Sequence, residues 1–509
     1  MTNGIWILGD QLSQKQAALA RFQEHKTETP VIFIESSDYA RQRRYHAQKL
    51  VLVWSAMRHF AEELRAEGWP VNYCITTDFQ IPLSAWIEAH QITELWIMTP
   101  TDLPFQKIIE NLVLPCKIEL IANNHFLWSK AAFQAWATNR KRLLLEDFYR
   151  EGRKRFQILM DGKKPIGDQW NFDKDNRKPP KKLPKTPKTL EFLPDKITES
   201  VLAKVQTLNT LTYGELQPFR WAVTRSQALE VLEYFIQENL GYFGTYQDAM
   251  VTNEFTLWHS LISPYLNLGL LTPKEIIDLV EIAYFEQDIP LNNVEGFIRQ
   301  ILGWREYMQG LYHFLGEDYS QHNWFGHDHE LPDFYWDREK TEMNCLYQVL
   351  KQVEETGYAH HIQRLMILSN FALIVGVDPQ AIEAWFHGAF IDAYDWVMQT
   401  NVLGMGQFAD GGILASKPYA SSANYIHKMS DYCGNCVYNQ SDRVGEKACP
   451  FNFFYWDFLN RHYDKLKTSG RMNLMLGNLK RINESEMEEM QKSAKQWREK
   501  FIQKSVCSI

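Results

Sequence analysis

Residues 4–13 read GIWILGDQLS, and this stretch decides how the first part of the chain folds. Its apolar run at 5–8 ends at Gly9-Asp10, which is typical of a buried strand followed by a turn. Similar runs follow at 31–35, 71–75, 94–98 and 117–121, and amphipathic helical patterns at 48–67 and 83–90 lie between them. Strands that alternate with helices predict a doubly wound α/β domain, with a parallel sheet covered by helices on both faces.

Polar side chains follow the first two predicted strands. Asp10 and Gln11 come after the first strand, and Glu35 ends the second. No GxGxxG stands there, so the dinucleotide-binding fingerprint is absent. Because open parallel sheets bind ligands at the carboxyl ends of their strands, Asp10 and Glu35 are candidate ligand-binding groups. Capping a helix or facing solvent is an equally open interpretation.

The middle of the chain is basic and rich in proline. Residues 140–188 contain 16 Lys or Arg against 7 Asp or Glu, although the whole chain carries a net charge of −8. Proline-rich sequence such as RKPPKKLPKTPK at 177–188 predicts an extended connector. Its charge predicts either a phosphate-binding face or a solvated linker.

Helical periodicity then continues nearly to the end, for example at 228–238 and 273–285. We therefore expect an α/β domain at 1–135, a connector at 136–200 and a large all-α domain at 201–509. The amino terminus lacks a basic signal-peptide region, and the longest apolar stretch, 365–377, is interrupted by Ser369 and Asn370. We expect a cytoplasmic protein without a membrane span.

Four of the seven cysteines form a metal-binding pattern. Cys433 and Cys436 make a CxxC, Cys449 precedes a proline, and Cys345 lies 88 positions before Cys433. Four such thiolates suit a tetrahedral zinc or a [4Fe–4S] cluster, and the Cys-Pro with its aromatic surroundings favours iron–sulfur. Unconnected buried thiols are the alternative; Cys74, Cys116 and Cys507 are scattered.

Three further segments carry candidate site residues. In WHSLISPYLNLG (258–269), Ser260, Ser263 and Pro264 fit a loop that enters a helix, where free N–H groups could bind a pyrophosphate or merely be capped. ILGWREY (301–307) fits a packed tryptophan beside a surface ion pair. HHIQRLM (360–366) lacks HExxH spacing, so its paired histidines suit acid–base chemistry, substrate contact or a structural role.

Together these segments closely resemble the FAD-binding half of the photolyase and cryptochrome superfamily. The four cysteines resemble its iron–sulfur branch, the prokaryotic (6-4) photolyases and related bacterial cryptochromes. Further segments of that branch are WNFDKDNR (170–177), GMGQFADGG (404–412) and KPYASSANYIHKMSDYCGNC (417–436). The resemblance covers essentially the whole chain.

The resemblance implies three cofactors: FAD in the helical domain, a [4Fe–4S] cluster, and a 6,7-dimethyl-8-ribityllumazine antenna in the α/β domain. The antenna residues expected from their places at the strand ends are Asp10, Gln11 and Glu35, and the cluster ligands that the resemblance implies are Cys345, Cys433, Cys436 and Cys449. The FAD-binding residues are His259, Ser260, Leu261, Ile262, Ser263, Trp304, Arg364, Asp392 and Tyr394. The electron-transfer residues are Trp385, Trp336 and Tyr394. The superfamily's usual chain of three tryptophans is not traceable by spacing.

The activity that the resemblance implies is light-driven repair of UV-damaged DNA by a monomeric lyase. Reduced FAD donates an electron to a (6-4) pyrimidine photoproduct that has been flipped out of the duplex. The implied catalytic residues are His360, His361, Tyr419 and Tyr425, with His361 as the proton donor and His360 orienting it. A blue-light photoreceptor of the cryptochrome type, which signals through the redox state of its flavin, is the alternative.

Overall fold

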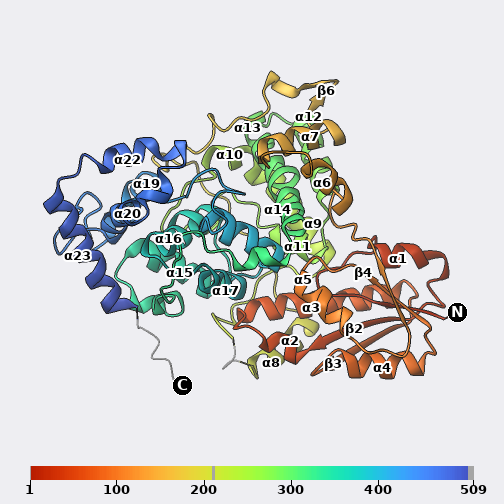
Figure 1. Ribbon diagram of the computed structural model, residues 1–509. Helices are drawn as coiled ribbons and strands as arrows, with labels where there is room; N and C mark the ends of the chain where they lie inside the picture. Colours follow the sequence, from red (N-terminus) through yellow and green to blue (C-terminus); the bar gives the residue numbers. More distant parts are fainter. Residues whose placement is uncertain (1, 209–211, 503–509) are drawn as a thin grey trace.

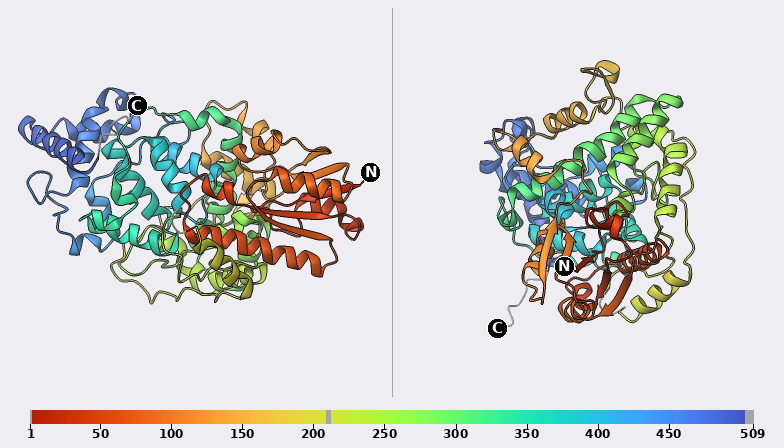
Figure 2. Two further views of the ribbon diagram at one scale, coloured as in Figure 1. Left: turned by 90° about the horizontal axis from the view of Figure 1, so that it is seen from below. Right: turned by 90° about the vertical axis from the view of Figure 1, so that its right-hand side faces the viewer.

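The computed structural model describes residues 2–208 and 212–502, so Cys507 lies outside the described residues (Figure 1). The chain forms an α/β part and a larger helical body, which confirms the predicted fold class. The α/β part lies at one end of an elongated molecule, and the last helix, α23 (Glu484–Phe501), lies at the other (Figure 2).

The α/β part is built on five parallel strands in the order β3-β2-β1-β4-β5. They are β1 (Asn3–Trp6), β2 (Val31–Ser36), β3 (Val71–Thr76), β4 (Glu94–Met98) and β5 (Lys117–Ile121). The first strand was predicted at 5–8 but lies at 3–6. Ile7 and Leu8 are buried like strand residues, but the strand pairing ends at Trp6. The prediction was shifted because an apolar run reflects burial and not the pairing of strands.

Alternate residues of the central strands face opposite helical layers. Ile5 and Phe33 pack with α3 (Ala47–Ala66), whereas Trp6 and Ile32 pack with α4 (Gln80–Ala89). Both faces of the sheet are therefore covered, as in a doubly wound domain. The shorter helices of this part are α1 (Ala17–Phe22), α2 (Ser37–Arg41) and α5 (Leu103–Glu110).

The chain crosses between the two parts more than once. Helices α6 (Lys130–Ala137) and α7 (Leu145–Phe156) already pack on the helical body, against α14 (Glu306–Leu315) and the turn before it. After the proline-rich segment, α8 (Lys196–Gln206) returns to the α/β part and packs along α3.

The remaining helices form the body. They are α9 (Arg225–Tyr234), α10 (Phe243–Tyr246), α11 (Ser263–Leu268), α12 (Pro273–Glu286), α13 (Leu291–Ile298), α15 (Asn344–Thr356), α16 (Asn370–Val375), α17 (Pro379–Ala389), α18 (Asp395–Met398), α19 (Ala423–Met429), α20 (Pro450–Arg461), α21 (Tyr463–Leu466) and α22 (Asn473–Leu479). Within residues 2–208 and 212–502, no helix is both long and apolar enough to cross a membrane.

Several helices of the body are interrupted by π-helical turns, at η4 (Phe235–Asn239), η6 (Arg299–Arg305), η10 (Gln363–Ser369) and η11 (Gln399–Gly406). π-Helical turns are rare and concentrate at functional sites. Three of these four coincide with the segments GWREY, HHIQRLM and GMGQFADGG. The unusual backbone therefore lies where the sequence motifs do.

Candidate functional site

Three histidines from distant segments meet in the helical body. His259 lies in the loop before α11, and His360 and His361 lie directly before η10. The imidazoles of His259 and His360 stack, with ring centroids 4.4 Å apart and planes inclined by 11°. The ring of His361 lies 5.6 Å from that of His259. Burial lowers the pKa of His259 to about 3 and that of His360 well below 6.5, so both rings are neutral at pH 7.

A forked ion pair lies in the same region. Arg364, on η10, donates to both carboxylate oxygens of Asp392, at 2.9 and 3.0 Å. The hydroxyl of Ser263 donates to Asp392 at 2.7 Å, and the guanidinium lies 4.1 Å from the ring centroid of Phe390. Two charge-assisted bonds and an aromatic face fix the guanidinium plane. The structure thus brings together three residues predicted to bind FAD.

The loop before α11 differs in detail from the expectation. Pro264 lies in the first turn of α11 as predicted, but the helix has only six residues and Ser263 binds Asp392 instead of capping it. Leu261 has a φ of +56°, a conformation that is unusual for a residue other than glycine. Such strain is characteristic of ligand-binding loops.

Unsatisfied nitrogen atoms test whether this pocket suits a polar ligand. His259 Nε2 and both ring nitrogens of His360 are buried without a hydrogen-bond partner. Buried polar groups normally have partners, so these nitrogens suit a hydrogen-bonding ligand such as the expected flavin. The residues around them, Arg364 and Ser263 included, are of the types that would hold its polar groups.

Asp248 is a site residue that the sequence reasoning missed. Its buried carboxylate accepts a hydrogen bond from Tyr425 at 3.0 Å and lies 3.8 Å from His361 Nε2. Arg177 approaches the same carboxylate at 3.9 Å. The YFGTYQD stretch around Asp248 offers no catalytic spacing, so only the fold reveals this contact.

His361 differs from its two neighbours in exposure. Its side chain is 51% exposed, so water reaches the ring. Desolvation lowers its pKa, and the cations Arg177 and Arg364 lower it further. Tyr419 is half-buried nearby, and burial raises its pKa. His361, Tyr419 and Tyr425 therefore lie in one cluster around Asp248 and Arg177.

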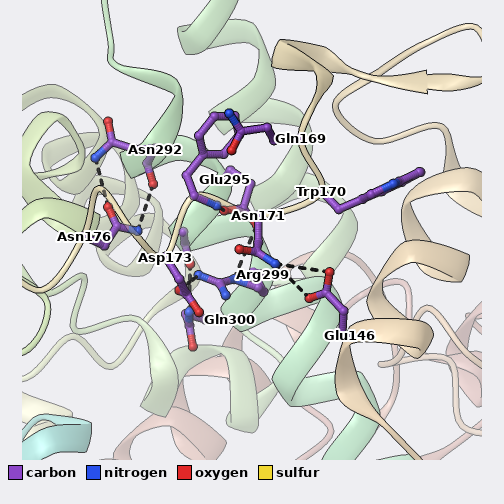
Figure 3. Close-up of polar contacts among 12 residues, drawn as sticks. Glu146, Gln169, Trp170, Asn171, Asp173, Asn176, Asn292, Glu295, Arg299 and Gln300 are labelled. Carbon is purple, nitrogen blue, oxygen red and sulfur yellow. Dashed lines mark hydrogen bonds and ion pairs between the residues drawn. The ribbon is translucent and has the colours of Figure 1, made fainter.

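The segment 170–177, which ends at Arg177, is fixed by contacts to the helical body, several of which Figure 3 shows. Asn171 donates to the carboxylate of Glu146 on α7, and the backbone N–H of Phe172 donates to Glu295 on α13. Asp173 pairs with Arg299, and Asn176 exchanges hydrogen bonds with Asn292. The segment has no regular secondary structure, so these side-chain contacts fix it.

The predicted electron-transfer residues do not form one chain of ring contacts. Trp385 is fully buried, donates from Nε1 to the carbonyl of Tyr335 at 2.8 Å, and lies 5.0 Å from that ring. Trp336 instead contacts the ring of Tyr213 and the guanidinium of Arg44. Tyr394 lines a cavity at the sheet edge, while Trp304 packs with the aromatic cluster around Trp396. The electron route stays a prediction.

The four predicted metal ligands converge. Cys345, Cys433, Cys436 and Cys449 all line one cavity, whose other walls are mostly apolar and aromatic. Burial and the neighbouring thiols raise the pKa of Cys345 well above 9 and that of Cys449 to about 12. Cys345 and Cys449 are buried and Cys433 and Cys436 are half-buried, and four cysteines that converge in this way can bind a metal as thiolates, so this donor set fits a metal centre.

A second cavity lies at the carboxyl edge of the sheet, between β1 and β4, where the strand order reverses. It encloses about 940 Å³, part of it open to solvent, and is lined by residues of both parts, Asp10, Lys49, Asp102, His387 and Tyr394 among them. This is where doubly wound sheets bind ligands. Burial raises the pKa of Asp10 to about 6.

The other two predicted antenna residues lie outside this cavity lining. The carboxylate of Glu35 is engaged by Arg58 at 2.7 Å and by the Tyr73 hydroxyl, so it stabilises the interior. Gln11 is fully buried and donates to the carbonyl of Met98. Ser36, one residue beyond Glu35, lines the cavity instead.

Comparisons with known proteins agree with this architecture. The family model described as deoxyribodipyrimidine photo-lyase-related protein matches residues 5–221. A (6-4) photolyase of Agrobacterium fabrum is 44% identical over 480 residues, which cover 93% of this chain and 94% of that protein. The chain belongs to the photolyase family, in its (6-4) branch.

Solved structures of this family share the fold. A bacterial class III photolyase from Agrobacterium tumefaciens has a TM-score of 0.57 at 18% identity, with 92% of each chain covered. A cryptochrome from Synechocystis sp. PCC6803 has a TM-score of 0.53 at 15% identity, with 80% of this chain and 82% of that chain covered. Membership of the photolyase family implies FAD as the cofactor, and the pocket of His259, Arg364 and Asp392 fits it.

Proposed function

We propose that this photolyase-family chain repairs (6-4) pyrimidine photoproducts in UV-damaged DNA by light-driven electron transfer. The observation that carries the proposal is the 44% identity, over 93% of the chain, to a (6-4) photolyase. Reduced FAD, when bound and excited by light, supplies an electron to the lesion. The chain's own residues must flip, hold and protonate that lesion, since photolyases act on bases taken out of the duplex.

We assign the proton-donor role to His361. Its partly exposed ring can reach a substrate, whereas His360 is buried and can only orient its surroundings. At pH 7 the lowered pKa keeps His361 neutral while Arg177 and Arg364 are close by. A DNA phosphate that engages Arg177 would relieve this repulsion and leave Asp248, 3.8 Å away, to favour the imidazolium. Substrate binding would thereby raise the pKa of His361 toward the value that a general acid needs.

The basic segment supports the DNA partner. Residues 140–188, which have a local excess of positive charge, include Arg177 at the pocket edge. Phosphate contacts of this kind position a duplex without reading its sequence. The ordered contacts of 170–177 keep Arg177 at the pocket edge and spare the entropy of ordering a loop on binding.

We further propose a [4Fe–4S] cluster on Cys345, Cys433, Cys436 and Cys449, and 6,7-dimethyl-8-ribityllumazine in the cavity at the sheet edge. The convergence of the four cysteines on one mostly apolar and aromatic cavity supports a metal centre, and the Cys-Pro at Cys449 with its aromatic surroundings favours an iron–sulfur cluster over zinc. The antenna assignment is supported by a cavity of mixed apolar and polar lining at the switch point of the sheet.

The test is repair of defined lesions by His361→Ala. Duplex DNA that carries one (6-4) product is illuminated with the wild type and the variant, and restored bases are quantified. We expect a loss of about 10²-fold or more, as for a positioned acid, with FAD content unchanged. His427→Ala, at an exposed histidine on α19, is the matched control and should repair normally. Wild-type yield from His361→Ala with full FAD would refute the assignment.

The same experiment tests the photoreceptor alternative. Wild-type protein that repairs neither a (6-4) product nor a cyclobutane dimer, although its bound flavin is photoreduced, would support signalling and overturn repair. Arg364→Ala gives a contrast, because this residue is bound to Asp392 in the cofactor pocket. We expect Arg364→Ala to lower the FAD content of the protein more than it lowers the affinity for the lesion.

A further inference from the structure

Three potential metal ligands lie together beside the sheet-edge cavity, far from the cysteines in sequence. Glu383 and His387 are four residues apart on α17 and share one helix face, and Asp395 begins α18. One ligand atom of each lies within 4.8 Å of the other two. We call these three residues the interface triad, because His387 also lines the cavity between the α/β part and the body.

Two atoms of the interface triad are unsatisfied. The side chain of His387 is only 9% exposed, and its Nδ1 has no hydrogen-bond partner. Glu383 Oε1 is also buried without a hydrogen-bond partner. These two atoms are 3.6 Å apart, which is too long for a hydrogen bond. Nδ1 is therefore a buried donor or acceptor that points toward a carboxylate without binding it, an arrangement that needs an explanation.

The protonation states suit a cation between them. Burial lowers the pKa of His387 well below 6.5, and the nearby cations Lys49 and Arg43 lower it further, so its ring is neutral and free to ligate at pH 7. Burial raises the pKa of Glu383 and of Asp395, which shows that the hydrogen bonds and cations nearby do not fully compensate these carboxylates. Asp395 accepts from the Tyr312 hydroxyl and from Gln399.

The charges around the triad also leave room for a divalent ion. Lys49 of α3 donates to the carbonyls of His387 and Ala393. The carboxyl groups that interact across this region are Asp10 and Asp102, which follow β1 and β4, and Glu383 and Asp395 of α17 and α18. The cations are Lys49 of α3 and Arg43, which lies between α2 and α3. Asp392 is already neutralised by Arg364. Burial raises the pKa of Asp102 to about 8, so this group is mostly protonated at pH 7; with Asp10, Glu383 and Asp395 ionised against the two cations, an excess of one negative charge would remain.

We propose that Glu383, His387 and Asp395 bind one divalent transition-metal ion. One imidazole and two carboxylates form a ligand set for Zn²⁺ or Mn²⁺, with an open position for water. Ligand atoms about 2.1 Å from a tetrahedral ion lie roughly 3.4 Å apart, close to the separation of His387 Nδ1 and Glu383 Oε1. The ion would link α17 to α18 at the wall of the cavity. This proposal does not depend on which lesion the protein repairs.

The experiment is a Mn²⁺ titration of the full-length holoprotein, washed with a chelator, in which electron paramagnetic resonance reports the free ion. Mn²⁺ is the probe because thiolates bind it poorly, so the four cysteines do not compete. We expect one saturable Mn²⁺ per chain, and an affinity lowered by about 10-fold or more in Glu383→Gln and His387→Gln. Lys49→Met should raise the affinity, because it removes a repelling cation; a purely structural role of the triad would not produce this gain.

Two controls accompany the titration. His313→Gln changes a half-buried histidine of α14, and Glu286→Gln changes an exposed carboxylate of α12; both variants should bind Mn²⁺ as the wild type does. Absence of saturable uptake by the wild type up to about 1 mM would overturn the proposal, and this outcome needs no variant to fold. Unchanged affinity in both triad variants would overturn it equally.

Discussion

Asp392→Asn tests the forked ion pair of the cofactor pocket. The wild-type carboxylate accepts two bonds from Arg364, at 2.9 and 3.0 Å, and one from Ser263, at 2.7 Å. The two charged side chains are only 17% and 7% exposed. Removal of one partner of a buried pair typically costs 3–5 kcal/mol. Because asparagine keeps one acceptor oxygen and Phe390 still faces the guanidinium, we expect a loss of about 3 kcal/mol in the free energy of unfolding.

The assay is urea-induced unfolding, followed together with FAD content. The matched control is Asp278→Asn, which breaks a surface pair with Lys274 whose side chains are 44% and 61% exposed. Such exposed pairs contribute at most about 1 kcal/mol, so this variant should unfold close to the wild type. If Asp392→Asn shifted the unfolding midpoint no further than Asp278→Asn does, the pair would not stabilise the pocket and our reasoning would fail.

Two further variants test the metal centre and the sheet-edge cavity. Cys436→Ser should purify with little iron and low solubility, because metal binding is coupled to folding. The control Cys74→Ser, on β3, should keep its iron. Equal iron content in the two variants would contradict the ligand assignment. The free energy of unfolding of Asp10→Asn should equal that of the wild type near pH 4 and exceed it by about 1–3 kcal/mol at pH 7, as measured by urea unfolding at each pH. The pKa of Asp10 in the folded protein, about 6, is raised above its value in the unfolded chain. The protonated carboxyl therefore stabilises the wild type at low pH, and this stabilisation is lost as the pH rises through 6. A difference in stability between the two proteins that stays constant across this range would exclude the mechanism.

Local patterns predicted the sheet well, because strands and their burial are recorded in consecutive residues. The predicted strand at 94–98 coincides with β4, and that at 117–121 with β5. The helix predicted at 273–285 is α12 within one residue. The first strand was misplaced because Ile7 and Leu8 are buried beyond the end of the ladder.

Contacts between distant segments were beyond this reasoning. The stacking of His259 on His360 joins positions about a hundred residues apart, and no periodicity encodes it. Asp248 was not singled out from the sequence, and only the fold brings its carboxylate within 3.8 Å of His361 Nε2. Glu35 lay at the expected strand end, but Arg58 on α3 binds its carboxylate. The role of a side chain depends on the residues that it contacts in the fold, and a single sequence does not show which distant residues those are.

The return of α8 to α3 determines how this chain can be divided. A fragment cut after residue 135 would lack α8 and would leave the face of α3 that α8 covers exposed to water. It would also lack His387 and Tyr394, which complete the wall of the sheet-edge cavity. The two parts are therefore interlaced and not merely tethered, so they should melt in one transition. Exchange of the α/β part between relatives would require α8 and the cavity wall to be transplanted with it.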